Sequence, residues 1–211
     1  MTRRDREGVT SRVEGRAWTV GLLAWAVALL PLTAARAQAP FAAGTKVLGL
    51  GGALSISHDT RSDIDLDTLT GFELLPHLGY VLTDSTGPAW LRGNLQVLAE
   101  PTLVHLRDDT SSSTVVGASG LARWIFSGTR RLRPYVEVGV GALFGETALY
   151  QTDCEVNFLL QAGPGLLVSL TDRTMLTVGY RFQHISNGGA CSDNVGINSS
   201  ALYLGVGYLF P

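Results

Sequence analysis

The chain has 211 residues, of which 45% are hydrophobic and only 16% are charged. This length fits one domain, and the 25 glycines exceed the usual share of roughly 7%, which argues against a coiled coil, a disordered chain or a charged helical bundle. A formal charge of −2 argues against a nucleic-acid-binding domain, and two cysteines without a C-x-x-C motif argue against a zinc-ribbon metal site.

The first segment, residues 1–37, has the pattern of a secretory signal peptide. An arginine-rich start precedes a short apolar run over 17–32, and small-residue cleavage motifs follow at Ala37 and Ala39. This order of regions is typical of an exported protein, so we expect cleavage after Ala37 or Ala39. The alternative is an uncleaved membrane anchor, which the short apolar run and Pro31 disfavour.

The remaining segment, 38–211, contains no apolar stretch of the roughly 20 residues that a membrane helix needs. Eight segments instead alternate between apolar and small or polar residues: 45–58, 70–83, 89–106, 114–127, 133–149, 156–171, 174–187 and 198–210. The loops between them alternate in length, long at 59–69, 107–113, 150–155 and 188–197 and short at 84–88, 128–132 and 172–173. Transmembrane β-barrels show this pattern of long outer loops and short periplasmic turns.

The alternation places apolar residues on one face of each segment. In 133–149, for example, Val136 and Val138 share one face, while Glu137 and Gly139 share the other. A soluble β-sandwich also alternates, with its apolar face turned inward. Three features favour an apolar surface that faces lipid. They are the export signal, the aromatic residues near the strand ends, and the polar side chains that would fill the barrel interior.

Aromatic residues on the apolar face lie near strand ends, as in the girdles of membrane barrels. They are Tyr80, Trp124, Phe126, Tyr208 and Phe210 near the short turns, and Phe72, Phe144, Phe158 and Phe182 near the long loops. The opposite face carries Glu73, His77, Arg92, Gln96, Glu100, Arg123, Glu137, Gln161, Arg181 and Gln183. Side chains fill an eight-stranded barrel. We therefore predict an all-β, eight-stranded antiparallel transmembrane barrel in the outer membrane, with an internal polar network and no pore.

Most motifs of catalytic or nucleotide-binding sites are absent, including G-x-S-x-G, H-E-x-x-H and the Walker loop. His58 and His105 lie at strand–loop borders, where we expect ordinary surface residues. His77 has interior parity and is expected to join the polar network.

The seventh segment and its loop contain the one pattern that suggests catalysis. His184 and Ser186 continue the outward parity of the seventh segment, and Asn198 and Ser200 share the outward face of the eighth. Residues two apart on a strand are separated by roughly 6.6 Å, and a near-opposite residue on the next strand by about 5 Å. A nucleophile, a base and an orienting group therefore come within reach of one another. The alternative, which parity leaves open, is that the strands end here and these side chains enter water or lipid headgroups.

The motif H-x-S-N-G starting at His184, followed by N-x-G-I starting at Asn194, resembles the outer-membrane lipid A 3-O-deacylases, which are acyloxyacyl-hydrolase-like barrels. The resemblance implies a serine esterase that removes an ester-linked acyl chain from lipid A in lipopolysaccharide, among outer-membrane lipids and without a metal or cofactor. It implies Ser186 as the nucleophile and His184 as the base. The residues that it suggests for the oxyanion hole are Asn187, Gly188 and Asn194.

One position departs from the family pattern, because Asn198 stands where the family has the Glu of its triad. An Asn holds the imidazole tautomer but does not neutralise an imidazolium, and losing a triad carboxylate can cost about 10⁴ in kcat. Three outcomes follow from the sequence: weakened activity, substitution by Asp193, or a retained fold without the reaction. The last is the rival function, a non-catalytic structural or adhesion barrel acting through acidic loop residues (Asp59, Asp63, Asp65, Asp67, Asp108 and Asp109).

The two cysteines, Cys154 and Cys191, lie in loops that we place on the same outer side of the membrane. Because the exported protein meets an oxidising compartment, we predict a disulfide between them, the alternative being two free thiols.

Overall fold

The computed structural model describes residues 41–58, 68–145, 154–191 and 196–210. Eight strands account for most of them: β1 (Lys46–His58), β2 (Thr70–Val81), β3 (Gly93–Arg107), β4 (Ser112–Phe126), β5 (Leu132–Phe144), β6 (Val156–Ser169), β7 (Thr174–Ser186) and β8 (Ile197–Phe210). No helix in these residues is long and apolar enough to cross a membrane. The predicted signal peptide lies outside the described residues.

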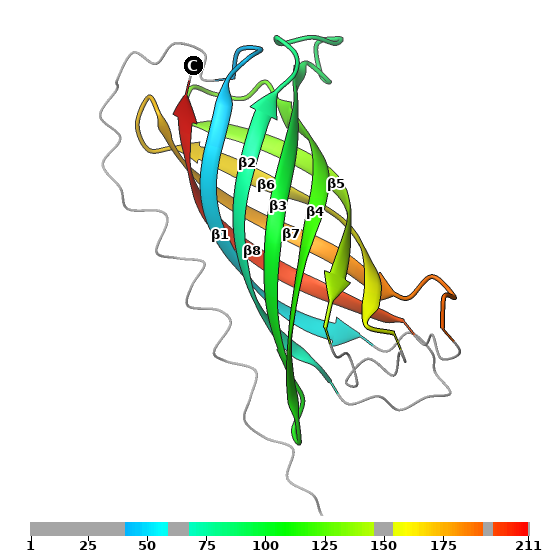
Figure 1. Ribbon diagram of the computed structural model, residues 1–211. Helices are drawn as coiled ribbons and strands as arrows, with labels where there is room; N and C mark the ends of the chain where they lie inside the picture. The colour runs from blue at the N-terminus through cyan, green and yellow to red at the C-terminus, as the bar shows by residue number, and fades with distance from the viewer. Residues whose placement is uncertain (1–40, 59–67, 146–153, 192–195, 211) are drawn as a thin grey trace, which may run out of the picture. The chain divides into compact units, whose positions relative to one another are not determined.

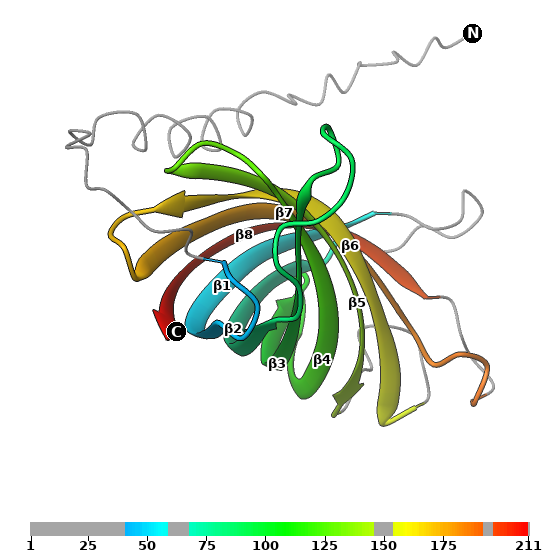
Figure 2. The ribbon, with the colours of Figure 1, turned by 90° about the horizontal axis from the view of Figure 1, so that it is seen from above.

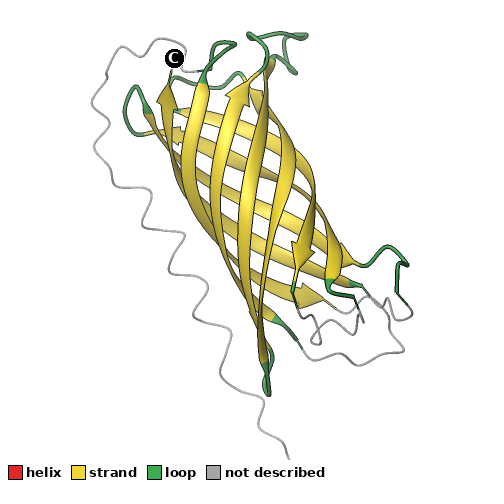
Figure 3. Cartoon of the chain, viewed as in Figure 1, coloured by secondary structure: helices red, strands yellow, loops and turns green. Residues whose placement is uncertain are grey.

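The eight strands form a closed antiparallel barrel in which each strand pairs with its neighbours in sequence (Figures 1 and 3). Closure comes from β1 and β8, which pair from Lys46 opposite Phe210 to His58 opposite Asn198. The view from above in Figure 2 shows the curved wall that this pairing completes. A closed barrel satisfies every strand edge, as a membrane-spanning sheet requires, so the predicted fold class is confirmed.

Two predicted boundaries are wrong. The segment predicted from residue 89 begins as β3 only at Gly93, and Arg92 is exposed in the preceding connection, not inside the barrel. The loop predicted as long at 107–113 is a turn over 108–111. The carboxylate of Asp108 accepts hydrogen bonds from the backbone N–H groups of Thr110 (2.7 Å) and Ser111 (2.6 Å). This local turn extends both strands further than their hydropathy indicates.

The surface of the barrel is apolar, as the parity predicts. Large side chains from every strand stand outward, among them Leu48 (53% exposed), Val140 (63%) and Leu202 (60%). The outward aromatic residues Phe72, Tyr80, Phe158 and Phe210 are also exposed near strand ends. Exposed apolar area on this scale requires a covering of lipid.

The interior holds an ionic network, which confirms the predicted polar filling. Arg123 donates to Oε2 of Glu137 from Nε (2.9 Å) and from a terminal nitrogen (2.7 Å). Arg181 joins Glu137 Oε1 (2.8 Å) to both carboxylate oxygens of Glu100 (2.7 and 3.1 Å). The guanidinium groups of Arg123 and Arg181 also stack over Tyr135 and Tyr203 at 4.3 and 4.5 Å. Because these groups are almost fully buried, the network holds opposite walls of the barrel together.

Glycines make room for the interior aromatic rings. A Cβ atom on Gly51 or Gly205 would overlap the ring of Tyr203, and one on Gly165 would overlap Tyr135. The crowding explains the high glycine content on the inward face.

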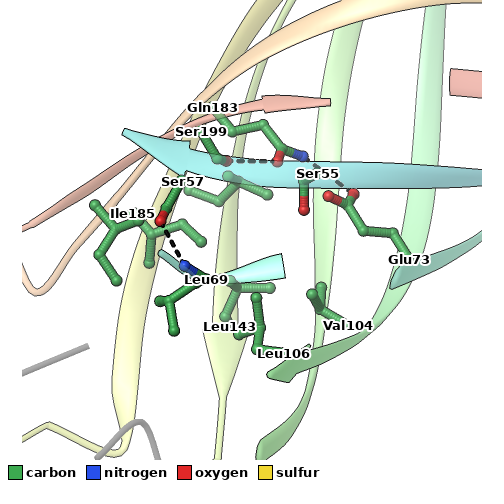
Figure 4. A pocket seen from close by; sticks show the side chains of 12 residues that line it. Ser55, Ser57, Leu69, Glu73, Val104, Leu106, Leu143, Gln183, Ile185 and Ser199 are labelled. Carbon is green, nitrogen blue, oxygen red and sulfur yellow. Dashed lines mark hydrogen bonds between the residues drawn. The ribbon is translucent and has the colours of Figure 1, made fainter. Parts of the chain in front are cut away.

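Toward the outer end, the interior is packed closely (Figure 4). Ser199 donates to Gln183, Gln183 donates to Glu73, and apolar side chains surround this chain of bonds. The remaining cavity is about 20 Å³, enough for about one water molecule. A hydrocarbon chain therefore has no room inside this part of the barrel.

Candidate active site

The β7–β8 hairpin brings the predicted His and Asn together on the outside of the barrel. His184 stands directly opposite Asn198 in the strand register. Both side chains are half-buried and share the outward face with exposed Phe182 and Leu202. The site therefore lies on the lipid-facing surface, near the loop that joins β7 to β8. This end of the barrel is opposite to the one with the short turn at 170–173 between β6 and β7.

A hydrogen bond of 2.7 Å joins Nδ1 of His184 to Oδ1 of Asn198. Because Oδ1 is only an acceptor, Nδ1 carries the proton in this pair and Nε2 keeps its lone pair. This is the tautomer that a general base needs for a serine hydroxyl. The pair therefore has the geometry of a histidine and an orienting residue.

Ser186 ends β7 two residues beyond His184, on the same outward face. Within the described residues, no hydrogen bond joins its hydroxyl to His184. Such contacts are often long without substrate and tighten in the Michaelis complex. The strand geometry therefore places Ser186 near His184 without a hydrogen bond between the two.

The loop after β7 is held by a tight turn. Asn187 is fully buried, and its Oδ1 accepts from the backbone N–H of Gly189 at 2.8 Å. Gly188 has a φ of 65°, and a Cβ atom there would lie 3.3 Å from the ring of Phe158. The Asn187 side chain is buried, so its Nδ2 donor is not presented to the outer surface, and backbone N–H groups such as that of Gly188 are the better oxyanion candidates.

Gly196 lies next to the His184 ring. Its φ of 71° favours glycine, and a Cβ atom there would lie 3.2 Å from Cε1 of His184. This residue was not predicted from the sequence as part of the site. Asn194 and Asp193 lie outside the described residues.

The loops of the site are tied by a disulfide between Cys154, just before β6, and Cys191, after β7, with their Cα atoms 5.9 Å apart. The bridge joins the predicted pair of cysteines. It fixes the segment after β7 to the neighbouring hairpin.

An apolar groove of about 750 Å³ runs along the outside of the barrel from β3 to β7 and ends at His184. Small outward residues keep it open, including Gly120, Ala122 and Ala162, and a Cβ atom on Gly120 would meet nothing within 4 Å. Val138, Val140, Leu160 and Phe182 line it. Its apolar lining suits a hydrocarbon chain.

A second cluster of polar side chains, contributed by three strands, lies beside the pair of His184 and Asn198. Nε2 of His58 (β1) is 2.7 Å from Oγ of Ser200 (β8), and the Tyr180 hydroxyl (β7) is 2.8 Å from the same oxygen. His58 is exposed, as expected of a surface residue, and its side chain also contacts Ser200 across the β1–β8 pairing. Parity alone placed Ser200 outward, but the contact depends on the pairing of β1 with β8, which no local pattern reveals.

No cluster of three or more His, Cys, Asp or Glu side chains suited to a metal occurs in the described part of the chain. A closed eight-stranded barrel with an apolar surface, a charged interior and a polar site at the lipid boundary defines an outer-membrane β-barrel protein. Comparison with known proteins gives its family.

The family model of the lipid A 3-O-deacylases (PagL) matches residues 77–207, so the chain belongs to this family. The crystal structure of the outer membrane enzyme PagL is 19% identical and has a TM-score of 0.59. The match covers 74% of this chain and 97% of that one. Neisserial surface protein A (NspA) is 16% identical with a TM-score of 0.51, covering 79% and 99%. At these identities the two structures show a shared fold. No curated protein sequence matches the chain.

Proposed function

We propose that this protein is a serine esterase that hydrolyses an ester-linked acyl chain of lipid A in the outer leaflet. The observation that carries the proposal is the hydrogen bond of 2.7 Å between His184 and Asn198 on the lipid-facing surface, in a chain of the deacylase family. Ser186 is the nucleophile, His184 the base and Asn198 the orienting residue.

The reaction proceeds by acyl transfer to Ser186. Its Oγ attacks the ester carbonyl carbon and its proton passes to Nε2 of His184. The tetrahedral intermediate collapses, the sugar hydroxyl leaves with the proton from His184, and an acyl-Ser186 ester remains. Water then attacks this ester with His184 again as base, which releases the fatty acid and restores Ser186. Backbone N–H groups near Gly188 are the donors proposed for the oxyanion.

The groove that ends at His184 supports a lateral approach of the substrate. Lipid A already lies in the leaflet against the outer surface of the barrel, so its acyl chain reaches the groove without leaving the membrane. The packed interior near Gln183 offers no competing site of useful size.

A second candidate function is a non-catalytic barrel with a structural or adhesion role. It is favoured by the replacement of the family Glu by Asn198 and by the absence, among the described residues, of a hydrogen bond between Ser186 and His184. The acidic residues Asp108 and Asp109 lie at the exposed tip of the β3–β4 hairpin, where a partner has access to them.

The two functions differ in what the protein does to lipid A in a cell. The wild-type chain and Ser186→Ala are expressed in a Gram-negative host, and the masses of the extracted lipid A are compared. The esterase proposal expects a species lighter by one acyl chain in the wild type only. Lipid A masses that are unchanged in both strains, relative to the host without either gene, support the non-catalytic barrel.

A further inference from the structure

The cluster of His58, Tyr180 and Ser200 contains a hydroxyl and an imidazole already in hydrogen-bond contact. The 2.7 Å between His58 Nε2 and Ser200 Oγ lies within the range that a nucleophile and its base require. When Ser200 donates to His58, the Tyr180 hydroxyl donates to Ser200 Oγ over 2.8 Å. The three side chains therefore form one chain of hydrogen bonds with a consistent direction.

The cluster is distinct from the site at Ser186. In the strand register Ser200 stands opposite Phe182 on β7, four residues from Ser186. Four residues of strand span roughly 13 Å. A single bound carbonyl therefore cannot meet both hydroxyls at once.

The surroundings of the cluster are lipid-facing. Ile56 on β1 stands opposite Ser200, and Leu54 and Leu202 form the next outward pair. All three are more than half exposed. Polar side chains on such a surface are costly unless they are paired and are common at functional sites. Their neighbours bring lipid chains alongside the hydroxyl of Ser200.

We propose that Ser200 and His58, with Tyr180 as a positioning residue, form a second serine-nucleophile site, which accepts the acyl group of a lipid ester in the outer leaflet. Ser200 Oγ attacks the ester carbonyl carbon while its proton moves to Nε2 of His58. The lipid alcohol leaves with that proton and acyl-Ser200 remains. Water, deprotonated by His58, then releases the fatty acid and restores the hydroxyl of Ser200. This site does not depend on Ser186 being a nucleophile.

The test uses a long-chain fluorophosphonate, which labels activated serines, on full-length protein folded in detergent micelles. In Ser186→Ala, peptide mass spectrometry is expected to find the adduct on Ser200. Adding His58→Gln is expected to slow this labelling at least a hundredfold, since a general base contributes roughly 10²–10⁴. Adding Tyr180→Phe is expected to slow labelling of Ser200, while in otherwise wild-type protein Tyr180→Phe leaves labelling of Ser186 unchanged.

Thr114→Val is the matched control, because Thr114 is also an exposed hydroxyl bonded to a histidine, His105, at 2.9 Å. It should leave labelling of Ser200 unchanged, and heat-modifiable electrophoretic mobility reports folding of each variant. Folded Ser186→Ala without an adduct on Ser200 overturns the proposal. So does labelling of Ser200 that persists unchanged in His58→Gln. Labelling of Ser186 in the wild type is scored separately and reports on the primary site alone.

Discussion

The Nδ1 atom of His184 lies 2.7 Å from Oδ1 of Asn198, on the outer face of the barrel. An amide at this position orients the imidazole but leaves the imidazolium formed during attack without a counter-charge. In the proposed mechanism, the tautomer of His184 is therefore set while the electrostatic stabilisation that a carboxylate would supply is missing.

Replacing Asn198 with Glu should raise deacylation, because a carboxylate stabilises the imidazolium of His184. Replacing it with Ala should lower deacylation through loss of tautomer control. The rate of fatty acid release from lipid A in mixed micelles measures both effects, with gains of tenfold or more expected for Asn198→Glu. Equal rates for wild type, Ala and Glu would remove Asn198 from the mechanism and direct attention to Asp193.

Gly196→Ala should reduce kcat at least tenfold. The new methyl group would lie 3.2 Å from Cε1 of His184 in a backbone conformation that favours glycine. Gly189→Ala is the matched control, because Gly189 also has a positive φ, 82°, but its added methyl group would meet nothing within 4 Å. A comparable loss in both variants would show that backbone strain, not displacement of His184, causes the effect.

Glu137→Gln should lower the free energy of unfolding by about 3–5 kcal/mol, the usual cost of removing one partner of a buried ion pair. Glu137 accepts from both Arg123 and Arg181 in the barrel interior. Urea unfolding in detergent micelles measures the change, and Glu155→Gln, at an exposed turn, is the control. A loss below about 1 kcal/mol would show that the remaining polar groups and internal water replace the pair.

The β3–β4 turn should loosen in acid. Backbone N–H groups of Thr110 and Ser111 lower the pKa of the Asp108 carboxyl from its usual 3.8. The ionised Asp108 carboxylate therefore stabilises the turn fully at pH values above 3.8. This stabilisation is lost as the pH falls through the lower pKa that Asp108 has in the folded state. Protection of the Thr110 and Ser111 amides, measured by NMR in micelles as exchange relative to the intrinsic rate at each pH, should fall over this range. Exchange with the same pH dependence in Asp108→Asn would contradict the assignment.

Much of the fold follows from local pattern. Alternation along each strand predicts the outward faces of Val138 and Leu202 and the inward faces of Glu137 and Arg181, because side chains of a strand alternate strictly. The same parity places His184, Ser186 and Asn198 outward. Their proximity needs only the register of the β7–β8 hairpin.

Other features depend on contacts that local pattern does not contain. The bond between His58 and Ser200 forms only when β1 closes on β8, which lies some 140 residues away in the chain. Arg92 follows the inward parity of β3, but it lies in the connection just before the strand begins at Gly93. The short turn at Asp108 arises from side-chain hydrogen bonds, which hydropathy does not report.

The central claim is that Ser186 cleaves an acyl ester of lipid A, and its most direct test is the reaction of purified folded protein with purified lipid A in mixed micelles. Mass spectrometry follows both products, the lipid and the released acid. The account predicts lipid A lighter by one acyl chain and one equivalent of free fatty acid for Ser200→Ala, in which Ser186 is intact, and unchanged lipid A for Ser186→Ala/Ser200→Ala. Unchanged lipid A with folded Ser200→Ala, or undiminished cleavage by Ser186→Ala/Ser200→Ala, would contradict it.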